Sequence, residues 1–378
     1  MSRLLVVLGT RPEAIKLAPV LRELRQRAGA EEVRVLATGQ HAELTRRALA
    51  AFGLRADLEL PALEPGLSLT EATALLLRRV DEILAAAPPR WVLVQGDTTS
   101  ALAAGLAAFQ RGLRLVHVEA GLRSGRLDLP FPEEGHRRVL DDLAELLCAP
   151  TERCRENLES EGHPRERIVV TGNTAIDALE WMRQHAPLSG EPACLRGTTA
   201  SERVVLVTVH RRESWGAPLL SIAAAVRSLA RRHARDTRWI LPLHPNPAVA
   251  GPLRAALGDV DNVQLVEPLD PPELWACLAR ASFVLTDSGG LQEEAPSFGR
   301  PGLGLRECSE RSEGLDLRIA ELVGTETRAI EAACERLLSD PAELESMRPR
   351  SNPYGDGRAS ERIAAAILAR DAHAGEPR

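Results

Sequence analysis

The chain has 378 residues and a formal net charge of −6, and its composition is that of an ordinary globular protein. This length is enough for about two domains, each with its own buried core. The acidic balance and the lack of basic runs argue against binding to nucleic acid or to a membrane surface, and no apolar segment is as long as a membrane span. Because the first residues run directly into a predicted strand, we expect no signal peptide and a cytoplasmic protein.

Short apolar runs alternate with amphipathic stretches of helical length in the first half of the chain. Continuous apolar strands separated by helices are typical of a parallel sheet that is covered on both faces. The runs that we predict as strands are Leu4–Leu8, Val33–Thr38, Trp91–Gln95, Leu113–Glu119, Leu146–Ala149 and Ile168–Thr171.

The pattern restarts after a predicted helix over 173–185 and a loop-like stretch over 186–202. Five further strands are predicted over 204–210, 239–244, 263–268, 283–288 and 301–305. We therefore expect an α/β chain of two Rossmann-like doubly wound parallel-sheet domains, residues 1–178 and 179–355. The last stretch has a helical period, and we expect a helix at about 356–378 to pack back on the first domain.

The sequence shows no pattern for a metal or a redox cofactor. Its six cysteines have no CxxC spacing and its nine histidines are dispersed, which indicates reduced thiols rather than disulfides or a zinc site. No GxGxxG fingerprint with a downstream acid is present, and the only lysine, Lys16, is followed by Leu17 rather than by the Ser or Thr of a Walker loop. We predict no cofactor and no metal, and expect His117 and His136 to be structural.

Charged or glycine-rich clusters follow nearly every predicted strand. Ligands of doubly wound sheets bind beyond the carboxyl ends of the strands, so these clusters form the candidate site. In the first domain they are GTRPE (9–13), TGQH (38–41), QGDTTS (95–100), HVEAGLRSG (117–125) and FPEEGHRR (131–138). In the second they are TVHRRES (208–214), PLHPNP (242–247) and TDSGGLQEEAPSFG (286–299). We expect the two domains to face each other across a cleft that both sets line.

The segment TDSGGLQEE indicates an anion site. Ser288, Gly289 and Gly290 follow a strand and open a helix, where bare amides and the helix dipole favour an anion. Glu294 lies one turn further on, where a carboxylate can accept hydrogen bonds from ribose hydroxyls. An ordinary turn with a capping serine explains the same residues. Cations on neighbouring predicted loops favour diphosphate binding: His210, Arg211, Arg212 and Arg311.

The segment GTRPEAIK follows the same logic. Gly9 suits a tight turn, and Pro12 suits the first position of a helix. Arg11 and Lys16 then lie near the helix start, where cations oppose the dipole unless an anionic ligand compensates them. The alternative is a solvated arginine and a lysine that extends to solvent. We favour an anionic ligand, because the same strand-end pattern recurs elsewhere in the chain.

Three carboxylates end or follow predicted strands of the first domain: Asp97, Glu119 and Glu133. Carboxylates held together outside water raise one another's pKa and can share general acid and base work. Asp97 as a helix cap and Glu133 as a first-turn acid are ordinary structural alternatives. Glu119, which ends an apolar strand, is the hardest of the three to explain structurally.

Long motifs, in order from residue 4 to about 370, resemble those of the non-hydrolysing UDP-N-acetylglucosamine 2-epimerases. They are GTRPEAIKLAPV, GDTTSALAAGLAAF, HVEAGLRSG, FPEEGHR, TGNTAIDAL, HRRES, LTDSGGLQEEAPSFGRP and NPYGDG. The resemblance implies a glycosyltransferase-B-like fold with the substrate in the cleft. It also implies a homodimer that converts UDP-N-acetylglucosamine into UDP-N-acetylmannosamine for bacterial surface polysaccharides.

The resemblance further implies residue roles at the matching positions. Residues with chemical roles would be Asp97, Glu119, Glu133 and His210. Those that bind the substrate would be Arg11, Lys16, Arg137, Arg211, Ser288, Gly289, Gly290, Glu294 and Arg311. An allosteric site would contain Gln40, His41 and His244. The segment QHAEL (40–44) departs from the QHREM or QHRQM that is usual in the family, which leaves substrate activation open.

Epimerisation at C2 without a nicotinamide favours an elimination route. The C2 hydrogen has no adjacent carbonyl in the ring form, so the reaction would expel UDP from C1 as the proton leaves, giving a 2-acetamidoglucal to which UDP is added back. This route needs a diphosphate clamp and acid–base groups near C2. Three alternatives stay open: a same-mechanism epimerase acting on a related UDP-diacetamido-uronic acid, a UDP-sugar glycosyltransferase, and a catalytically silent nucleotide-sugar sensor.

Overall fold

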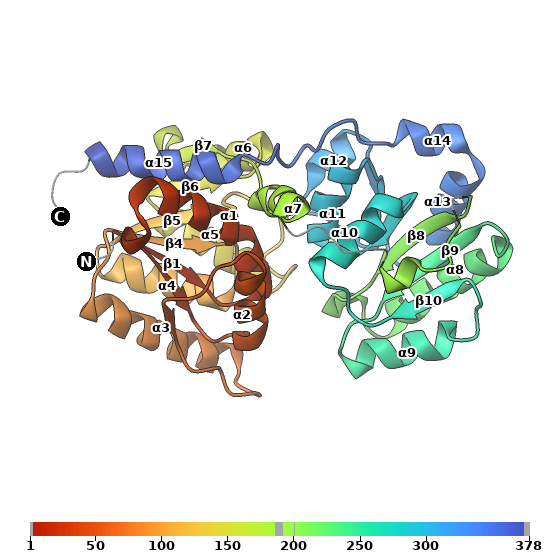
Figure 1. Cartoon of the computed structure of the whole chain (residues 1–378), viewed down its shortest axis with the longest axis horizontal. Coiled ribbons are helices and arrows are strands. Elements are labelled where there is room, and N and C mark those ends of the chain that lie inside the picture. Colours follow the sequence, from red (N-terminus) through yellow and green to blue (C-terminus); the bar gives the residue numbers. More distant parts are fainter. Residues whose placement is uncertain (1–2, 186–191, 200, 374–378) are drawn as a thin grey trace. The chain divides into compact units, whose positions relative to one another are not determined.

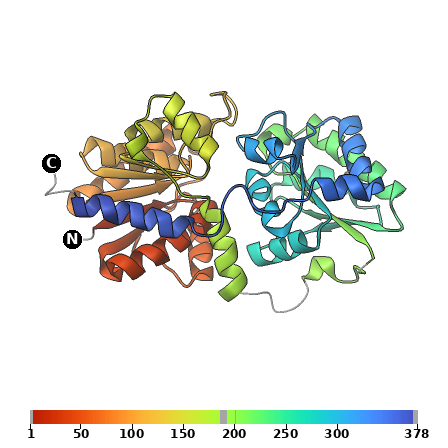
Figure 2. The same cartoon turned by 90° about the horizontal axis from the view of Figure 1, so that it is seen from above.

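The computed structural model describes residues 3–185, 192–199 and 201–373. They form two compact units (Figure 1, Figure 2). Unit 1 runs to Met182 and resumes at Tyr354, whereas unit 2 comprises Arg183–Pro353. Part of the stretch expected as a loop, residues 186–191 and 200, lies outside the described residues.

Unit 1 is built on a seven-stranded parallel sheet with the order β3-β2-β1-β4-β5-β6-β7. The order reverses between β1 and β4, the type of position where doubly wound sheets bind ligands. The strands are β1 (Leu4–Leu8), β2 (Val33–Ala37), β3 (Leu58–Glu59), β4 (Trp91–Gln95), β5 (Arg114–Val118), β6 (Leu146–Ala149) and β7 (Ile168–Val170).

Helices cover both faces of this sheet. Alternate residues of β1 point to opposite faces: Leu4, Val6 and Leu8 join the core cluster that includes α1 and α15, whereas Leu5 and Val7 join the cluster that includes α3, α4 and α5. Burial on both faces explains why the run is continuously apolar. The helices are α1 (Arg11–Ala28), α2 (Ala42–Ala51), α3 (Leu69–Ala86), α4 (Thr99–Gln110), α5 (Glu133–Leu143), α6 (Glu152–Ser160), α7 (Thr174–His185) and α15 (Ala359–His373).

Small residues let α5 approach α4 closely. Ala101, Ala104 and Ala108 of α4 are buried, and a Cβ added to Gly105 would lie 2.4 Å from Cδ2 of Leu140 on α5. The close contact fixes the position of α5, whose first residue is the candidate catalytic Glu133.

The C-terminal helix α15 belongs to unit 1, where it runs along the outside in Figure 1. Ile363 and Ile367 are buried in the core cluster that contains β1. Asp177 of α7 accepts hydrogen bonds from the backbone N–H of Ala359 (3.1 Å) and of Ser360 (2.7 Å), so it caps the start of α15. The first and last parts of the chain therefore share one core.

Unit 2 is built on a six-stranded parallel sheet with the order β10-β9-β8-β11-β12-β13. Its strands are β8 (Arg203–Thr208), β9 (Thr237–Pro242), β10 (Val263–Val266), β11 (Phe283–Thr286), β12 (Gly302–Gly304) and β13 (Ala320–Leu322). Its helices are α8 (Ala217–Arg232), α9 (Pro247–Leu257), α10 (Pro271–Arg280), α11 (Gly289–Glu294), α12 (Ser312–Asp316), α13 (Thr327–Ser339) and α14 (Pro341–Ser346). Short 3₁₀ helices complete the two units: η1 (Ala30–Glu32), η2 (Arg165–Arg167), η3 (Ala193–Leu195), η4 (Arg212–Ser214) and η5 (Ala295–Phe298).

Two strands lie outside the predicted set, β3 and β13. Each is the edge strand of its sheet and has only two or three residues, none of them fully buried. Short, half-exposed edge strands carry little apolar pattern, which is why the sequence does not show them.

Candidate active site

The predicted site residues follow the carboxyl ends of parallel strands in both units. Glu119 comes directly after β5 and adopts a left-handed backbone with φ of 69°. Such a conformation costs a residue with a side chain roughly 1–3 kcal/mol, and strain of this kind concentrates at functional sites. The Glu119 side chain is only 8% exposed. The fold thus holds a strained, nearly buried carboxylate at a strand end.

Lys16 of α1 binds Glu119 directly. Its Nζ lies 2.8 Å from both carboxylate oxygens, and Gln95 at the end of β4 donates a further hydrogen bond to Oε2. The sequence predicted that Lys16 contacts a phosphate. In the structure it contacts both oxygens of the Glu119 carboxylate and so fixes its position, and a phosphate contact stays a prediction.

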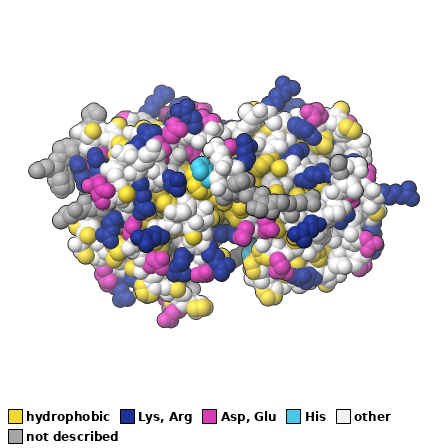
Figure 3. Space-filling view, in the orientation of Figure 1, with side chains coloured by type: hydrophobic (Ala, Val, Ile, Leu, Met, Phe, Trp, Pro, Cys, Tyr) yellow, Lys and Arg dark blue, Asp and Glu magenta, His cyan; other side chains and the backbone are white. Residues whose placement is uncertain are grey.

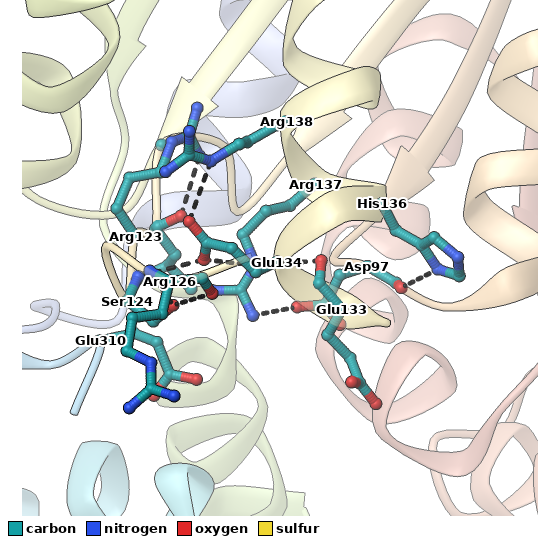
Figure 4. A network of polar contacts seen from close by, with 12 residues as sticks. Asp97, Arg123, Ser124, Arg126, Glu133, Glu134, His136, Arg137, Arg138 and Glu310 are labelled. Carbon is teal, nitrogen blue, oxygen red and sulfur yellow. Dashed lines mark hydrogen bonds and ion pairs between the residues drawn. The ribbon is translucent and has the colours of Figure 1, made fainter. Parts of the chain in front are cut away.

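Asp97, Glu133 and Arg137 meet between the loop after β4 and the start of α5 (Figure 4). Nη2 of the buried Arg137 lies 2.7 Å from Oδ2 of Asp97, whose side chain is 27% exposed. Nδ1 of His136 lies 2.8 Å from the Asp97 carbonyl oxygen. The half-buried Glu133 begins α5, and its carbonyl oxygen accepts a long hydrogen bond of 3.4 Å from Arg137.

Neighbouring polar residues have structural roles. Glu134 is fully buried and accepts hydrogen bonds from the Ser124 N–H and from Arg138 Nε, both at 3.0 Å (Figure 4). His117 is also fully buried, with Nδ1 2.6 Å from Asp141 Oδ1 and Nε2 2.8 Å from the carbonyl oxygen of Gly96. Both ring nitrogens of His117 are thus held by groups of the protein itself.

The backbone N–H groups at the start of α1 are bound by Glu13, a carboxylate of the same helix. Glu13 Oε2 accepts hydrogen bonds from the N–H groups of Gly9 (3.0 Å) and Thr10 (2.7 Å), and Thr98 donates to Oε1. Burial raises the pKa of Glu13, although these hydrogen bonds act in the opposite direction. A ligand phosphate therefore cannot use those two amides while Glu13 holds them, whereas Arg11 is exposed and can reach one.

The expected allosteric residues lie at the ends of β2 and β9. Gln40 Oε1 accepts hydrogen bonds from the Ser100 hydroxyl (2.6 Å) and N–H (3.2 Å), and the His41 N–H donates to the Gly9 carbonyl (2.8 Å). In unit 2 the His244 ring lies 6.5 Å from the His210 ring in a stacked arrangement. Gln40 and His41 thus adjoin the Gly9 turn, and His244 adjoins His210.

Gly289 makes room for Arg311. A Cβ at Gly289 would lie 2.6 Å from Cζ and Nη1 of Arg311, whereas at Gly290 the nearest atom would be 3.8 Å away. Ser288 Oγ accepts the N–H of Leu291 at 3.4 Å and so caps α11. The guanidinium of Arg311 is therefore packed against the first turn of α11.

A buried charge cluster surrounds Arg311. Its Nε donates to Glu293 Oε1 (2.8 Å), its Nη1 donates to Glu310 Oε2 (3.2 Å), and Arg306 Nη1 also donates to Glu310 Oε2 (2.9 Å). The pKa of the neighbouring Arg211 is lowered, first by burial and next by the positive charge of Arg306. Arginines that disfavour one another's charge in this way favour an anionic ligand. Sequence reasoning did not single out Arg306, although it begins the segment RECSERSEG (306–314).

Glu294 has a partner on a different helix. Trp275 Nε1 of α10 donates to Glu294 Oε2 at 2.8 Å, which fixes the carboxylate one turn into α11. A contact to ribose hydroxyls stays a prediction for this carboxylate. Trp275 was also missed, since 19 residues separate it from Glu294 and nothing local links them.

His210 follows β8 and contacts Asp287, the residue after β11. Nδ1 of His210 lies 3.2 Å from Asp287 Oδ1, and the side chain of His210 is 42% exposed. The pKa of His210 is lowered, chiefly because the surrounding loops exclude water, while the charge of Asp287 acts to raise it. Asp287 was not predicted, although it stands next to Ser288 in the TDSGG segment.

Comparison with known proteins identifies the family. The family model described as UDP-N-acetylglucosamine 2-epimerase matches residues 22–368. The UDP-N-acetylglucosamine 2-epimerase of Salmonella typhimurium is 43% identical over 374 residues, which cover 97% of this chain and 98% of that protein. The chain belongs to this family. The UDP-N-acetylglucosamine 2-epimerase of Bacillus subtilis is 40% identical over 366 residues, covering 97% of this chain and 95% of the relative.

Solved structures of the epimerase family agree with the fold. The Neisseria meningitidis UDP-GlcNAc 2-epimerase, determined bound to UDP-GlcNAc, matches with a TM-score of 0.90 and 38% identity over 97% of this chain and 99% of that chain. A spinosyn rhamnosyltransferase, only 17% identical, matches with a TM-score of 0.57, a likeness of fold alone. The expected glycosyltransferase-B-like class of two parallel-sheet domains is confirmed.

Three further observations concern the surface, the helices and possible metal sites. On the face drawn in Figure 3, acidic and basic side chains are intermixed over both units. None of the described helices is both long and apolar enough to cross a membrane. Within residues 3–185, 192–199 and 201–373, no cluster of three or more His, Cys, Asp or Glu side chains is arranged to hold a metal ion.

Proposed function

We propose that the chain interconverts UDP-N-acetylglucosamine and UDP-N-acetylmannosamine by eliminating UDP and adding it back through 2-acetamidoglucal. The observation that carries the proposal is the division of chemistry between the units. Unit 1 presents carboxylates held by cations at strand ends, and unit 2 presents arginines, a histidine and a glycine turn. Elimination of UDP requires both kinds of group, acid–base residues at C2 and an anion clamp at the diphosphate.

Proton transfer at C2 is assigned to Asp97, Glu119 and Glu133. The contacts of Asp97 with Arg137 and of Glu119 with Lys16 support this role, because each carboxylate is held at a defined position and still lies at a strand end. One group removes the C2 proton while UDP leaves, and another returns a proton to the opposite face. Positioned acids and bases of this kind typically contribute about 10²–10⁴-fold in rate.

The departing UDP is assigned to unit 2, with His210 stabilising the developing negative charge. The substrate contacts that we propose there are Arg211, Ser288, Gly289, Gly290, Glu294 and Arg311. Those in unit 1 are Arg11, Lys16 and Arg137. The mutual repulsion of Arg211, Arg306 and Arg311 supports an anion at this position, because a diphosphate would relieve it.

We further propose a cytoplasmic homodimer in which Gln40, His41 and His244 bind a second substrate molecule. The support for these last roles is the family membership and the positions of the three residues, next to the Gly9 turn and to His210. Size-exclusion chromatography with light scattering tests the dimer, and sigmoidal rate curves test the second substrate site.

The test of the main proposal is incubation of the purified chain with UDP-N-acetylglucosamine in D₂O. The expected result is formation of UDP-N-acetylmannosamine with deuterium at C2, observed by NMR. An ¹⁸O label placed at the oxygen that joins C1 of the sugar to the β-phosphorus should migrate to non-bridging positions of the β-phosphate. Product without label migration would contradict the elimination step. Three other results would replace the proposal by an alternative. Turnover only with a UDP-diacetamido-uronic acid would indicate the related epimerase, and transfer of the sugar to an acceptor would indicate a glycosyltransferase. Binding without turnover would indicate a nucleotide-sugar sensor.

A further inference from the structure

Asp287 is a buried carboxylate at the end of β11 for which the proposed reaction gives no direct use. Its side chain is fully buried, and its own N–H continues the ladder to β8 by donating to the Thr208 carbonyl at 3.2 Å. Burying a charge is costly unless hydrogen bonds compensate it. The partners of Asp287 therefore show what the carboxylate holds in place.

Those partners lie on one loop, the segment after β8. Asp287 accepts hydrogen bonds from the N–H of His210 (3.1 and 3.0 Å) and of Arg211 (2.9 Å), and from the Ser214 hydroxyl (2.9 Å). Two of the residues held in this way are ones to which we assign the departing diphosphate. The carboxylate thus anchors the loop that presents them.

The carboxylate also contacts the His210 ring itself. Nδ1 lies 3.2 Å from Asp287 Oδ1, within ion-pair distance, and the side chain of His210 is 42% exposed, so the ring stays accessible to a ligand. The negative charge of Asp287 favours the positively charged form of the ring. Asp287 therefore fixes the backbone of His210 and contributes a nearby negative charge to the surroundings of its ring.

The surroundings make this negative charge necessary. Exclusion of water, Arg211 and His244 all disfavour a positive charge on His210, and Asp287 opposes them, as does Glu213. Asp287 is the closer of the two acids to the ring, because it contacts Nδ1 and the backbone N–H together. An asparagine would keep most of the shape of Asp287 but none of this charge.

We propose that Asp287 is a positioning residue, which fixes the backbone of His210 and, through its negative charge beside Nδ1, keeps the imidazole able to carry positive charge opposite the departing UDP. The catalytic part of this inference, the effect on the departing UDP, rests on the function proposed above. Its structural part, the control of His210 by Asp287, does not depend on that function.

The first experiment is an NMR titration of the His210 imidazole in the full chain, assigned by its loss in His210→Gln. In Asp287→Asn the midpoint should fall by at least about one pH unit, equivalent to a tenfold change in protonation. Asp141→Asn is the matched control, because Asp141 is also fully buried and contacts the His117 ring at 2.6 Å. It should leave the His210 midpoint unchanged. An unchanged midpoint in Asp287→Asn would overturn the proposal.

The second experiment is kinetic. In Asp287→Asn, kcat should fall about tenfold with little change in KM, and the pH at which activity is lost should move downward with the His210 midpoint. In a His210→Gln background the same substitution should have almost no further effect on kcat. An equal loss in both backgrounds would show a general structural role and overturn the proposal.

Two provisions keep the tests decisive. If Asp287→Asn does not fold, Ser214→Ala is the substitute variant. It removes one hydrogen bond from the Asp287 carboxylate and keeps the charge, so the titration midpoint of His210 should rise. An unchanged midpoint would count against the proposal. Should the wild-type chain fail to epimerise UDP-N-acetylglucosamine, the proposed function would fall. The titration needs no substrate, and it would still decide whether Asp287 controls His210.

Discussion

Both units place a histidine beside a buried aspartate at the end of the sheet, but they use the pair differently. In unit 1 both ring nitrogens of His117 are held inside the protein, by Asp141 and by the Gly96 carbonyl. In unit 2 only one ring nitrogen of His210 contacts Asp287, and the ring is partly exposed. The histidine of the pair has a structural role in unit 1 and is a candidate ligand contact in unit 2.

The glycine turns of the two units also differ in which charged side chain lies against them. The amides after β1 are held by Glu13, a carboxylate of the chain itself. At the turn after β11, Gly289 instead gives space to the Arg311 cation. Unit 1 thus satisfies its own anion site and holds carboxylates at its strand ends, whereas unit 2 gathers cations. Under the proposed function, this difference separates a surface for proton transfer from a surface for a diphosphate, and the following changes test it.

The largest effect is expected from Glu119→Gln. Removing the charge from the carboxylate that Lys16 holds should lower kcat by about 10²–10⁴-fold, the usual contribution of a positioned acid or base. Steady-state kinetics with UDP-N-acetylglucosamine give the measurement. Glu43→Gln, an exposed acid on α2, is the control. Retention of more than a tenth of the wild-type kcat would remove Glu119 from the proton-transfer surface.

The next effect is expected from Gly289→Ala. The added Cβ would lie 2.6 Å from the Arg311 guanidinium and displace it, so binding of UDP should weaken about tenfold or more. Isothermal titration calorimetry with UDP checks this. Gly290→Ala, where the nearest atom is 3.8 Å away, should weaken binding much less. Equal losses in the two variants would show that Arg311 is not the reason.

Lys16→Met distinguishes two roles for the only lysine. If Lys16 holds Glu119, as its two 2.8 Å contacts indicate, kcat should fall about tenfold while KM changes little. If it binds the phosphate, KM and the affinity for UDP should change most. Kinetics and UDP titration on the same sample separate the two outcomes.

The smallest effect is expected from Glu13→Gln, on stability. The pKa of Glu13 is raised above 4.5 in the folded state, mainly by burial, so the folded chain holds this proton more tightly than the unfolded chain. Glu13 therefore makes the wild type lose stability as the pH rises from 4.5 through the raised value. The variant should lack this decline in denaturant unfolding at a series of pH values. An identical pH profile in both proteins would mean that Glu13 titrates normally.

The sequence predicted the architecture well where burial leaves a strong pattern. The strands β1, β4 and β6 begin and end where their apolar runs do, because all their residues are buried. The clusters after these strands were found for the same reason, since a parallel sheet brings its carboxyl ends to one edge. The two missed strands are half-exposed edges with no such pattern.

The partners of the site residues could not be predicted, because they are distant in the chain. Lys16 and Glu119 are 103 residues apart, and His210 and Asp287 are 77 apart. Motifs name the residues, but only the sheet order brings each pair together. One local signal was available for Gln95, a polar residue that ends a fully buried apolar strand.

The placement of α15 in unit 1 has a consequence for biosynthesis. Unit 2 is continuous in sequence, so all of its residues have been synthesised once Pro353 has been added. Unit 1 must wait for Ile363 and Ile367 to cover its sheet, although most of it is translated first. The core cluster on that face of the unit 1 sheet is therefore incomplete until the last part of the chain has been synthesised.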